Sequence, residues 1–363
     1  MRLRSIISES LRNISCGASR AFALMLAVAL AGALLGGAEA VSVVALENEA
    51  VTRIRANADV ATIVGGVVDG VACERLSEAG GGPSISGAMR DGSEVEFLAT
   101  PGKTLGSYEV TGGVIDLLAS GTTGMRSDTS GAWVSREVAQ DFGLTVGSRI
   151  QTDQGDISIA GVFDWPNDGR DTRFAYALVI PTSASDGDYQ ECWAKQWPTS
   201  DGLDTLLYTT AGSATASDGT RSQPGVTRLN KGFDTHYDAQ ATYLTRITRI
   251  MPYLALAVGM LIGVVAVRRR RLEYAGALHS GQFKGAQLLG MLTETLIWCG
   301  AGNICSCALL TAYCARAVPA DTATVLMGSI RMPLALLAGT VAAVFATGLT
   351  IRESQLFRLF KHR

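Results

Sequence analysis

The sequence predicts an α-helical membrane protein with four transmembrane helices and an extracytoplasmic α+β domain between the first and second helices. Three observations predict it: four apolar stretches, basic residues beside those stretches, and a long polar region after the first stretch. A helix needs about 20 apolar residues to cross the hydrocarbon core of a bilayer. Four such stretches in one chain argue against the core helices of a large soluble enzyme. The predicted transmembrane helices lie at residues 21–46, within 236–267, at 286–315 and at 332–351.

Basic residues predict the orientation in the membrane. Arg and Lys beside a span stay in the cytoplasm, and short loops carry this signal. The N-terminal arm (1–20), the loop 268–285 and the tail (352–363) are richer in Arg and Lys than the short loop 316–331. We therefore expect both termini and the loop 268–285 in the cytoplasm, and residues 47–249 and the loop 316–331 outside. The Ala, Gly and Arg bias suggests a bacterium, and hence a bacterial plasma membrane.

The first apolar stretch allows two interpretations. Ala38-Glu39-Ala40 follows a basic arm and an apolar run, which is the pattern of a cleavable signal peptide. Against cleavage, the run is longer than a usual signal core. In the arm, Ile7, Leu11 and Ile14 also recur at helical spacing, as in a helix lying along the inner membrane face. We favour an uncleaved anchor, and both interpretations leave the large domain outside.

Cysteine usage agrees with this topology. Only Cys73 and Cys192 fall in the predicted outer region, where an oxidising compartment favours a disulfide. The alternative is two buried free thiols. The four cysteines of the third span have no nearby His and are interpreted as small apolar packing residues rather than metal ligands.

The outer domain is predicted at residues 47–235. A short helix is expected at Ser135–Phe142, with Ser135 as the N-cap and Gly143 just past its end. Asp186–Asp204 and Gly212–Gly225 are predicted as loops. Short β-type runs separated by Gly and Asp predict strands at Asp59–Val64, Val95–Ala99, Arg149–Thr152, Ile157–Phe163, Ala175–Ile180 and Thr205–Thr209.

Catalytic and nucleic-acid-binding signals are missing from the sequence. Gly102-Lys103-Thr104 resembles the end of a phosphate-binding loop, but Phe97 stands where that loop requires Gly. The net charge of −2, without a basic stripe, gives no reason to expect nucleic acid. We expect no enzyme activity and no metal site. The three histidines are far apart in the predicted topology: His236, His279 and His362. Three acidic residues in a Gly/Asn-rich segment predict a solvated turn: Asp164, Asp168 and Asp171.

Three features mark the second and third spans. Tyr243, Ile247 and Ile250 recur at helical spacing and predict a stalk helix that enters the second span, with Pro252 as a kink. Gly259 and Gly263 permit close helix approach. Glu294 lies in the third span, where a carboxylate costs about 2.5–3.5 kcal/mol at mid-membrane. It either forms a polar tie to a neighbouring span or loop, or it reaches the interface.

Two stretches carry a family resemblance. The first begins with Arg268–Arg271 and Glu273-Tyr274, continues to Gly281, and reaches Glu294 thirteen residues later. The second stretch covers Trp133–Pro181. It contains Trp133-Val-Ser-Arg-Glu-Val-Ala, Gly143-Leu-Thr-Val-Gly147 and the strand ending in Gly161-Val-Phe163. In this order the motifs resemble the FtsX/MacB-type permeases of ABC transporters, which have one span, a large outer domain and three further spans. The sequence departs from their pattern at Leu278 and Ser280.

The resemblance implies a function and partners. It implies a permease subunit of an ABC-type export or mechanotransmission complex, with two copies of a separate ATPase and a second permease, as a homodimer or heterodimer. ATP and Mg²⁺ would belong to the ATPase, with no cofactor in this chain. Two alternatives remain: an FtsX-like regulator of cell-wall hydrolases, or a receptor-like membrane protein with no ATPase. The residues implied to contact the ATPase are Arg271, Glu273, Tyr274, Leu278, His279, Gly281 and Lys284.

Overall fold

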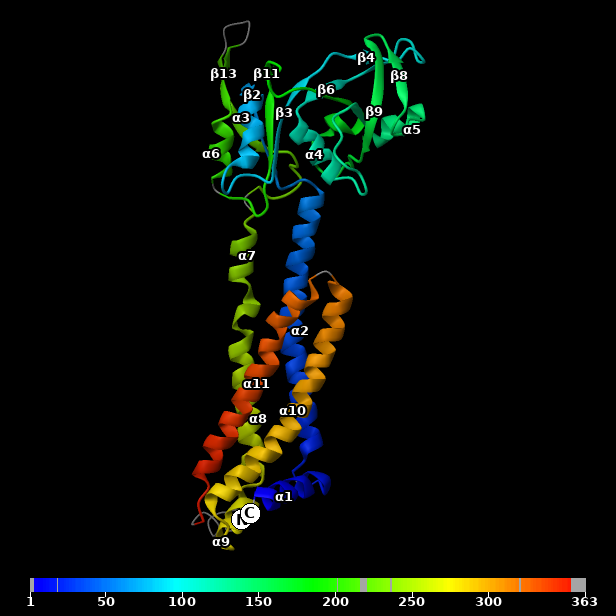
Figure 1. Ribbon diagram of the computed structural model, residues 1–363. Coiled ribbons are helices and arrows are strands. Elements are labelled where there is room, and N and C mark those ends of the chain that lie inside the picture. Colours follow the sequence, from blue (N-terminus) through cyan, green and yellow to red (C-terminus); the bar gives the residue numbers. More distant parts are fainter. Residues whose placement is uncertain are drawn as a thin grey trace. The chain divides into compact units, whose positions relative to one another are not determined.

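A computed structural model describes residues 3–17, 19–200, 202–215, 221–235, 237–319 and 321–353 (Figure 1). His236, His362 and most of the predicted tail lie outside these residues. The chain divides into two compact units. Met1–Asn48 and Ala241–Arg363 form the helical unit, and Glu49–Gln240 form the sheet domain. The boundary falls within helices α2 and α7.

The helical unit contains four helices that are long and apolar enough to cross a membrane. They occupy Ala21–Arg55, Ile247–Arg269, Lys284–Ala317 and Thr322–Thr350. Its helices are α1 (Leu3–Ser15), α2 (Ala21–Arg55), α7 (Ala239–Thr245), the 3₁₀ turn η3 (Ile247–Ile250), α8 (Met251–Arg269), α9 (Arg271–His279), α10 (Lys284–Ala317) and α11 (Thr322–Thr350).

Several predicted boundaries in this unit need correction. The first helix continues to Arg55, because residues 47–55 keep a helical composition although they are polar. The predicted loop 316–331 is mostly helix, because α11 begins at Thr322. The stalk is helical but breaks at Arg246, whose backbone is extended, and Pro252 lies in the first turn of α8, where proline is tolerated without a kink.

Glycines let α8 and α11 pack backbone to backbone. A Cβ atom at Gly259 would overlap the carbonyl oxygen of Leu336, and one at Gly339 would overlap that of Leu256. At Gly263 a Cβ would lie 2.6 Å from the carbonyl oxygen of Thr340. Such contact distances exclude even alanine without a shift of one helix, so these glycines set the spacing of the pair.

The sheet domain is built on one large mixed sheet. Its strand order is β15-β1-β12-β3-β6-β10-β7-β9-β8. These strands are β1 (Val60–Val64), β3 (Ile85–Asp91), β6 (Ser107–Val110), β7 (Ala132–Ser135), β8 (Arg149–Thr152), β9 (Gly155–Phe163), β10 (Leu178–Pro181), β12 (Glu191–Lys195) and β15 (Gly225–Arg228).

Smaller elements complete the domain. Two further sheets have the orders β11-β2-β13-β14 and β4-β5. Their strands are β2 (Gly66–Asp69), β4 (Val95–Glu96), β5 (Thr104–Leu105), β11 (Asp188–Tyr189), β13 (Ala211–Thr215) and β14 (Arg221–Ser222). The helical elements are α3 (Gly70–Arg75), η1 (Leu76–Glu78), α4 (Gly112–Ser120), α5 (Arg136–Phe142), η2 (Thr172–Tyr176) and α6 (Leu203–Tyr208).

The core of the domain is aromatic. Trp133, Phe163, Phe174 and Trp193 are fully buried and belong to one cluster that includes the nearly buried Trp165. A disulfide joins Cys73 of α3 to Cys192 of β12, with the Cα atoms 5.8 Å apart, which confirms the predicted pair. It links a helix that covers the sheet to an interior strand.

The secondary-structure predictions have mixed outcomes. The helix at 136–142 is confirmed: Ser135 accepts from the Val138 amide, and Gly143 adopts φ of 63° at the end. The strands at β1, β8 and β9 are also confirmed. The strand predicted at Thr205–Thr209 is wrong, because most of this stretch belongs to helix α6, in which Leu203 and Leu207 are spaced to bury one face.

Other predicted loops and strands are also wrong or only partly right. The predicted loop Asp186–Asp204 contains β12, an interior strand buried along nearly its whole length, so it lacks the alternation that marks half-buried strands. The predicted loop Gly212–Gly225 overlaps β13 and β14, and residues 216–220 within it are outside the described residues. Of the strand predicted at Val95–Ala99, only β4 is formed. The strand predicted at Ala175–Ile180 begins in η2 and becomes strand at Leu178.

Candidate functional site

The candidate site is the α9 segment, defined as residues 270–284. One face of α9 packs on the ends of other helices: Ala275 is buried, and Tyr274 and Leu278 pack against a cluster that includes Val267, Met291, Val344 and Ile351. Arg271, Glu273 and His279 of the same helix are exposed. The segment therefore contains a short helix that packs across the ends of α8, α10 and α11 and leaves several charged side chains exposed.

A glycine turn connects α9 to α10. Gly281 has φ of +91°, a left-handed conformation that favours glycine, and its amide donates to the Leu278 carbonyl oxygen at 3.1 Å. Phe283 follows with 79% of its surface exposed, and Lys284 begins α10. The turn thus presents an unburied aromatic ring beside the charged face of α9.

A buried ion pair fixes the segment to the third span. Arg270 Nη1 lies 2.5 Å from Glu294 Oε2, and the two side chains are 13% and 8% exposed. Asn13 Nδ2 of α1 donates to Glu294 Oε1 at 2.7 Å. Arg270 Nε also donates to Glu273 Oε2 at 2.8 Å. Glu294 is therefore a polar tie that joins α1, the start of the α9 segment and α10.

Three further polar contacts hold the same region. Gln287 Nε2 donates to the Tyr274 carbonyl oxygen, and Lys284 Nζ donates to the Leu349 carbonyl oxygen at the end of α11, both at 2.7 Å. His279 Nδ1 lies 2.7 Å from Glu353 Oε1. Burial raises the pKa of the Tyr274 phenol, so this side chain stays neutral over the physiological range. The inner face of α9 is thus held in one position.

Sequence reasoning found part of this site. It selected Arg271, which is exposed, and missed Arg270, which turns inward to Glu294. Asn13 and Phe283 were also missed. A carboxylate within a span requires a partner, and the adjacent run of four arginines was the available signal for one.

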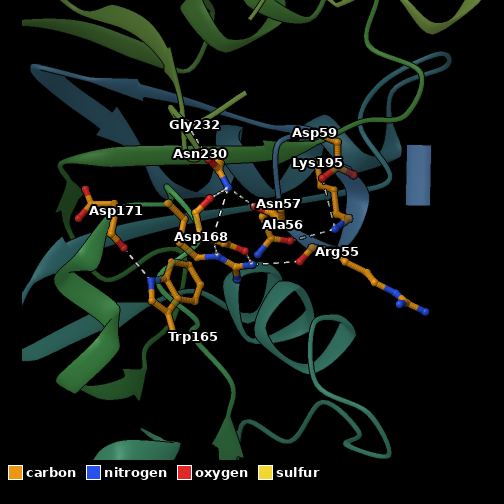
Figure 2. Close-up of polar contacts among 11 residues, drawn as sticks. Arg55, Ala56, Asn57, Asp59, Trp165, Asp168, Asp171, Lys195, Asn230 and Gly232 are labelled. Carbon is orange, nitrogen blue, oxygen red and sulfur yellow. Dashed lines mark hydrogen bonds and ion pairs between the residues drawn. The ribbon is translucent and has the colours of Figure 1, made fainter. Parts of the chain in front are cut away.

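A second polar cluster lies inside the sheet domain, where α2 ends (Figure 2). Arg170 Nη2 donates to the Arg55 carbonyl oxygen at 3.0 Å, and Asn230 Nδ2 donates to that of Ala56 at 2.8 Å. Asp168 binds the guanidinium of Arg170 through both carboxylate oxygens, at 2.8 and 2.7 Å. These donors satisfy carbonyl groups that a helix end leaves without intrahelical partners.

The acidic residues of this segment are not a free turn. Asp164, Asp168 and Asp171 each pair with an arginine: Arg136, Arg170 and Arg173. The prediction of a solvated turn is thus corrected, since Arg170 is only 5% exposed and lies against the Trp165 ring at 4.9 Å. Of the three, Asp168 acts at the end of α2, where it holds the Arg170 guanidinium that donates to the Arg55 carbonyl oxygen.

Comparisons with known proteins give structural matches only. No protein-family model and no curated protein matches the sequence. The chain is similar to a domain of a protein assigned as a permease from Porphyromonas gingivalis, with 15% identity, a TM-score of 0.33, and coverage of 52% of this chain and 97% of that one. It is also similar to the periplasmic region of MacB from Actinobacillus actinomycetemcomitans, with 9% identity, a TM-score of 0.32, and coverage of 54% and 97%. The function proposed below rests on the residues of this chain.

Proposed function

We propose that the chain is the permease subunit of an ABC-type export or mechanotransmission complex. In this proposal a separate ATPase hydrolyses ATP, and the movement is passed to the sheet domain on the outer side of the membrane. The observation that carries it is the α9 segment, whose apolar side chains pack on the span ends while its charged side chains and Phe283 stay exposed. This arrangement is suited to a surface that another protein binds.

The path of force follows from the contacts of the segment. A push on the exposed face of α9 reaches α8 directly, because only Arg270 separates the two helices. The same push reaches α10 through the Arg270–Glu294 pair and α11 through Lys284. The chain then connects α8 to the sheet domain through η3 and α7. ATP and Mg²⁺ are bound by the partner, and this chain supplies no catalytic group.

Co-purification from mild detergent tests the proposal. An ATP-binding protein should accompany the full chain, and Phe283→Ala should lower its recovery by about tenfold, a loss typical of a central aromatic contact worth about 1.4 kcal/mol or more. Tyr253→Ala is the matched control, because Tyr253 is 78% exposed but lies at the opposite end of α8. The control should keep the partner.

Two results would contradict the proposal. If no ATP-binding protein accompanies the wild-type chain, the receptor-like alternative replaces it. If Phe283→Ala and Glu273→Ala both leave recovery unchanged, the partner binds elsewhere. The mass of the intact complex separates a homodimer from a heterodimer of permeases and counts the ATPase copies, which we propose to be two.

A further inference from the structure

A groove of about 810 Å³ lies between α2 and α8 in the helical unit. Its rim is formed by Arg20, at the start of α2, and Arg269, at the end of α8. The two helices run in opposite directions, so these residues mark the same side of the spans. Further in, the groove is lined by apolar side chains such as Leu24, Ala27, Leu261 and Val265. It is charged at the rim and apolar below.

The charge at the rim is positive. Arg270 and Glu273 also line the groove. Arg270 binds both Glu273, at 2.8 Å, and Glu294, at 2.5 Å, so these three groups together carry one negative charge against the two positive charges of Arg20 and Arg269. Within the described residues, no carboxylate lies within ion-pair distance of Arg20 or Arg269, and both are exposed. Two arginines that have no acidic partner in the described part of the chain therefore line the opening.

The backbone of Arg20 is a second, independent observation. Its φ is 49°, a left-handed conformation that residues other than glycine seldom adopt. Such strain persists where the surroundings hold the residue in place and often marks a functional position. The turn between α1 and α2 here places a long cationic side chain at the mouth of the groove.

The depth of the groove matches the length of the first part of a lipid acyl chain. Ala27 and Leu261 lie about two helical turns from the two arginines, which is roughly 10–12 Å at the rise of an α-helix. This is about a third of the hydrocarbon core of a bilayer. Leu261 is 66% exposed, so the described residues leave most of its side chain uncovered.

We propose that this groove binds one anionic phospholipid from the leaflet on the α9 side. The phosphate lies between Arg20 and Arg269, and the first part of an acyl chain lies against Leu24 and Leu261. Under the topology predicted by the basic residues, this is the cytoplasmic leaflet. The inference requires only that α2 and α8 cross the membrane, and it does not depend on an ATPase partner.

Native mass spectrometry of the full chain tests the site. The detergent-purified protein is titrated with phosphatidylglycerol or phosphatidylcholine, and bound lipid is counted. We expect one preferred phosphatidylglycerol. The double variant Arg20→Gln/Arg269→Gln should weaken its binding by about thirtyfold, from the usual contribution of two basic residues near a lipid surface. Leu261→Trp should also weaken it, because the indole fills the groove without changing the charge.

The matched control is Arg268→Gln/Arg352→Gln. Both residues are exposed at the same ends of the spans, and neither lines the groove. Binding should stay within about twofold of wild type, since the groove is intact and only diffuse attraction is reduced. Equal losses in both double variants would overturn the proposal, because the attraction would then be unspecific.

Three further results would also overturn it. Equal binding of phosphatidylglycerol and phosphatidylcholine would remove the role of the arginines. Full competition by glycerol phosphate would assign the site to a free phosphate compound. A change from dimer to monomer in Leu261→Trp with unchanged lipid counts would assign the groove to a second copy of the chain.

Discussion

Different kinds of contact stabilise the interior of each of the two units. The sheet domain combines an aromatic core, a disulfide and polar groups that satisfy one another. The helical unit relies on glycines that bring backbones together and on a buried ion pair at one end. The sheet domain is closed by a covalent link, whereas in the helical unit an added methyl group changes the spacing of two helices and a lost charge leaves a buried partner behind. Substitutions in the two units should therefore have different signatures.

The largest expected effect is loss of the disulfide. Cys73 and Cys192 are 119 residues apart. Closing so long a loop stabilises a domain by about 4–5 kcal/mol in the chain-entropy model. In a domain of this size, Cys73→Ala/Cys192→Ala should lower the Tm of the domain transition by roughly 10 °C or more. Circular dichroism or calorimetry of the full chain measures it.

Reductant provides the control for this prediction. It should lower the Tm of the wild type toward that of the variant and leave the variant unchanged. A wild type that is insensitive to reductant would show that the bridge contributes little, and the aromatic core alone would then account for the stability.

Next in size is removal of the buried ion-pair partner in the helical unit. Glu294→Ala leaves Arg270 buried with only the exposed Glu273 as its counter-charge, and breaking a buried pair in this way costs about 3–5 kcal/mol. Glu353→Ala is the matched control, because its pair with His279 is exposed and should contribute almost nothing. Thermal unfolding in detergent measures both. Similar Tm values for the two variants would mean that Glu294 is not a structural tie.

Glycine substitution should have a smaller effect, with opposite signs at two positions. Gly259→Ala forces α8 and α11 apart and should destabilise the unit by about 1–3 kcal/mol, as overpacking does. Gly328→Ala meets open space within α11 and should stabilise it by up to about 1 kcal/mol through helix propensity. Thermal unfolding in detergent again provides the measurement. Two changes of the same sign would contradict close packing at Gly259.

The smallest predicted effect is a pH dependence in the sheet domain. Burial raises the pKa of Asp59 above 3.8, and Lys195 at 3.5 Å offsets this only in part. Burial in the folded state favours the protonated carboxyl of Asp59. The wild type therefore has its full stability at pH values below the pKa of Asp59 in the unfolded chain, and it loses stability as the pH rises through the raised pKa of the folded state. Asp59→Asn should therefore gain stability relative to wild type as the pH rises from 3 to 7.

A matched variant controls the pH experiment. Asp116→Asn removes an exposed carboxylate from α4 and should show no change relative to wild type across this range. Denaturant unfolding at several pH values compares the three proteins. If Asp59→Asn loses stability relative to wild type as the pH rises, the ion pair with Lys195 outweighs the cost of burial.

Local signals in the sequence predict local structure well. The helix at 136–142 was predictable because its N-cap serine and its terminal glycine are encoded beside it. The four membrane helices were predictable from length and apolar composition. By contrast, β12 was missed because an interior strand buried on both faces shows no alternation. Its place in the sheet depends on β1 and β3, far away in the chain.

The candidate site shows the same limit at the level of one residue. The sequence indicated that the arginine run and Glu294 matter, but it did not indicate which arginine meets the carboxylate. That choice depends on the break between α8 and α9 at Arg270, whose φ and ψ are −106° and 13°. The break turns Arg270 toward Glu294 and leaves Arg271 exposed. A change of one position along a helix turns a side chain by about 100°, so a pattern of identical residues cannot resolve it.

The end of α2 has a consequence for the order of events during synthesis. The donors that bind its last carbonyl groups, Arg170 and Asn230, lie 115 and 174 residues downstream of their acceptors. At about 5–20 residues per second, ribosomes need roughly 10–30 s to deliver the second donor. During that interval the Ala56 carbonyl oxygen lacks its donor, and an isolated helix end frays. The final turn of the first long helix is thus completed only when nearly the whole sheet domain has been made.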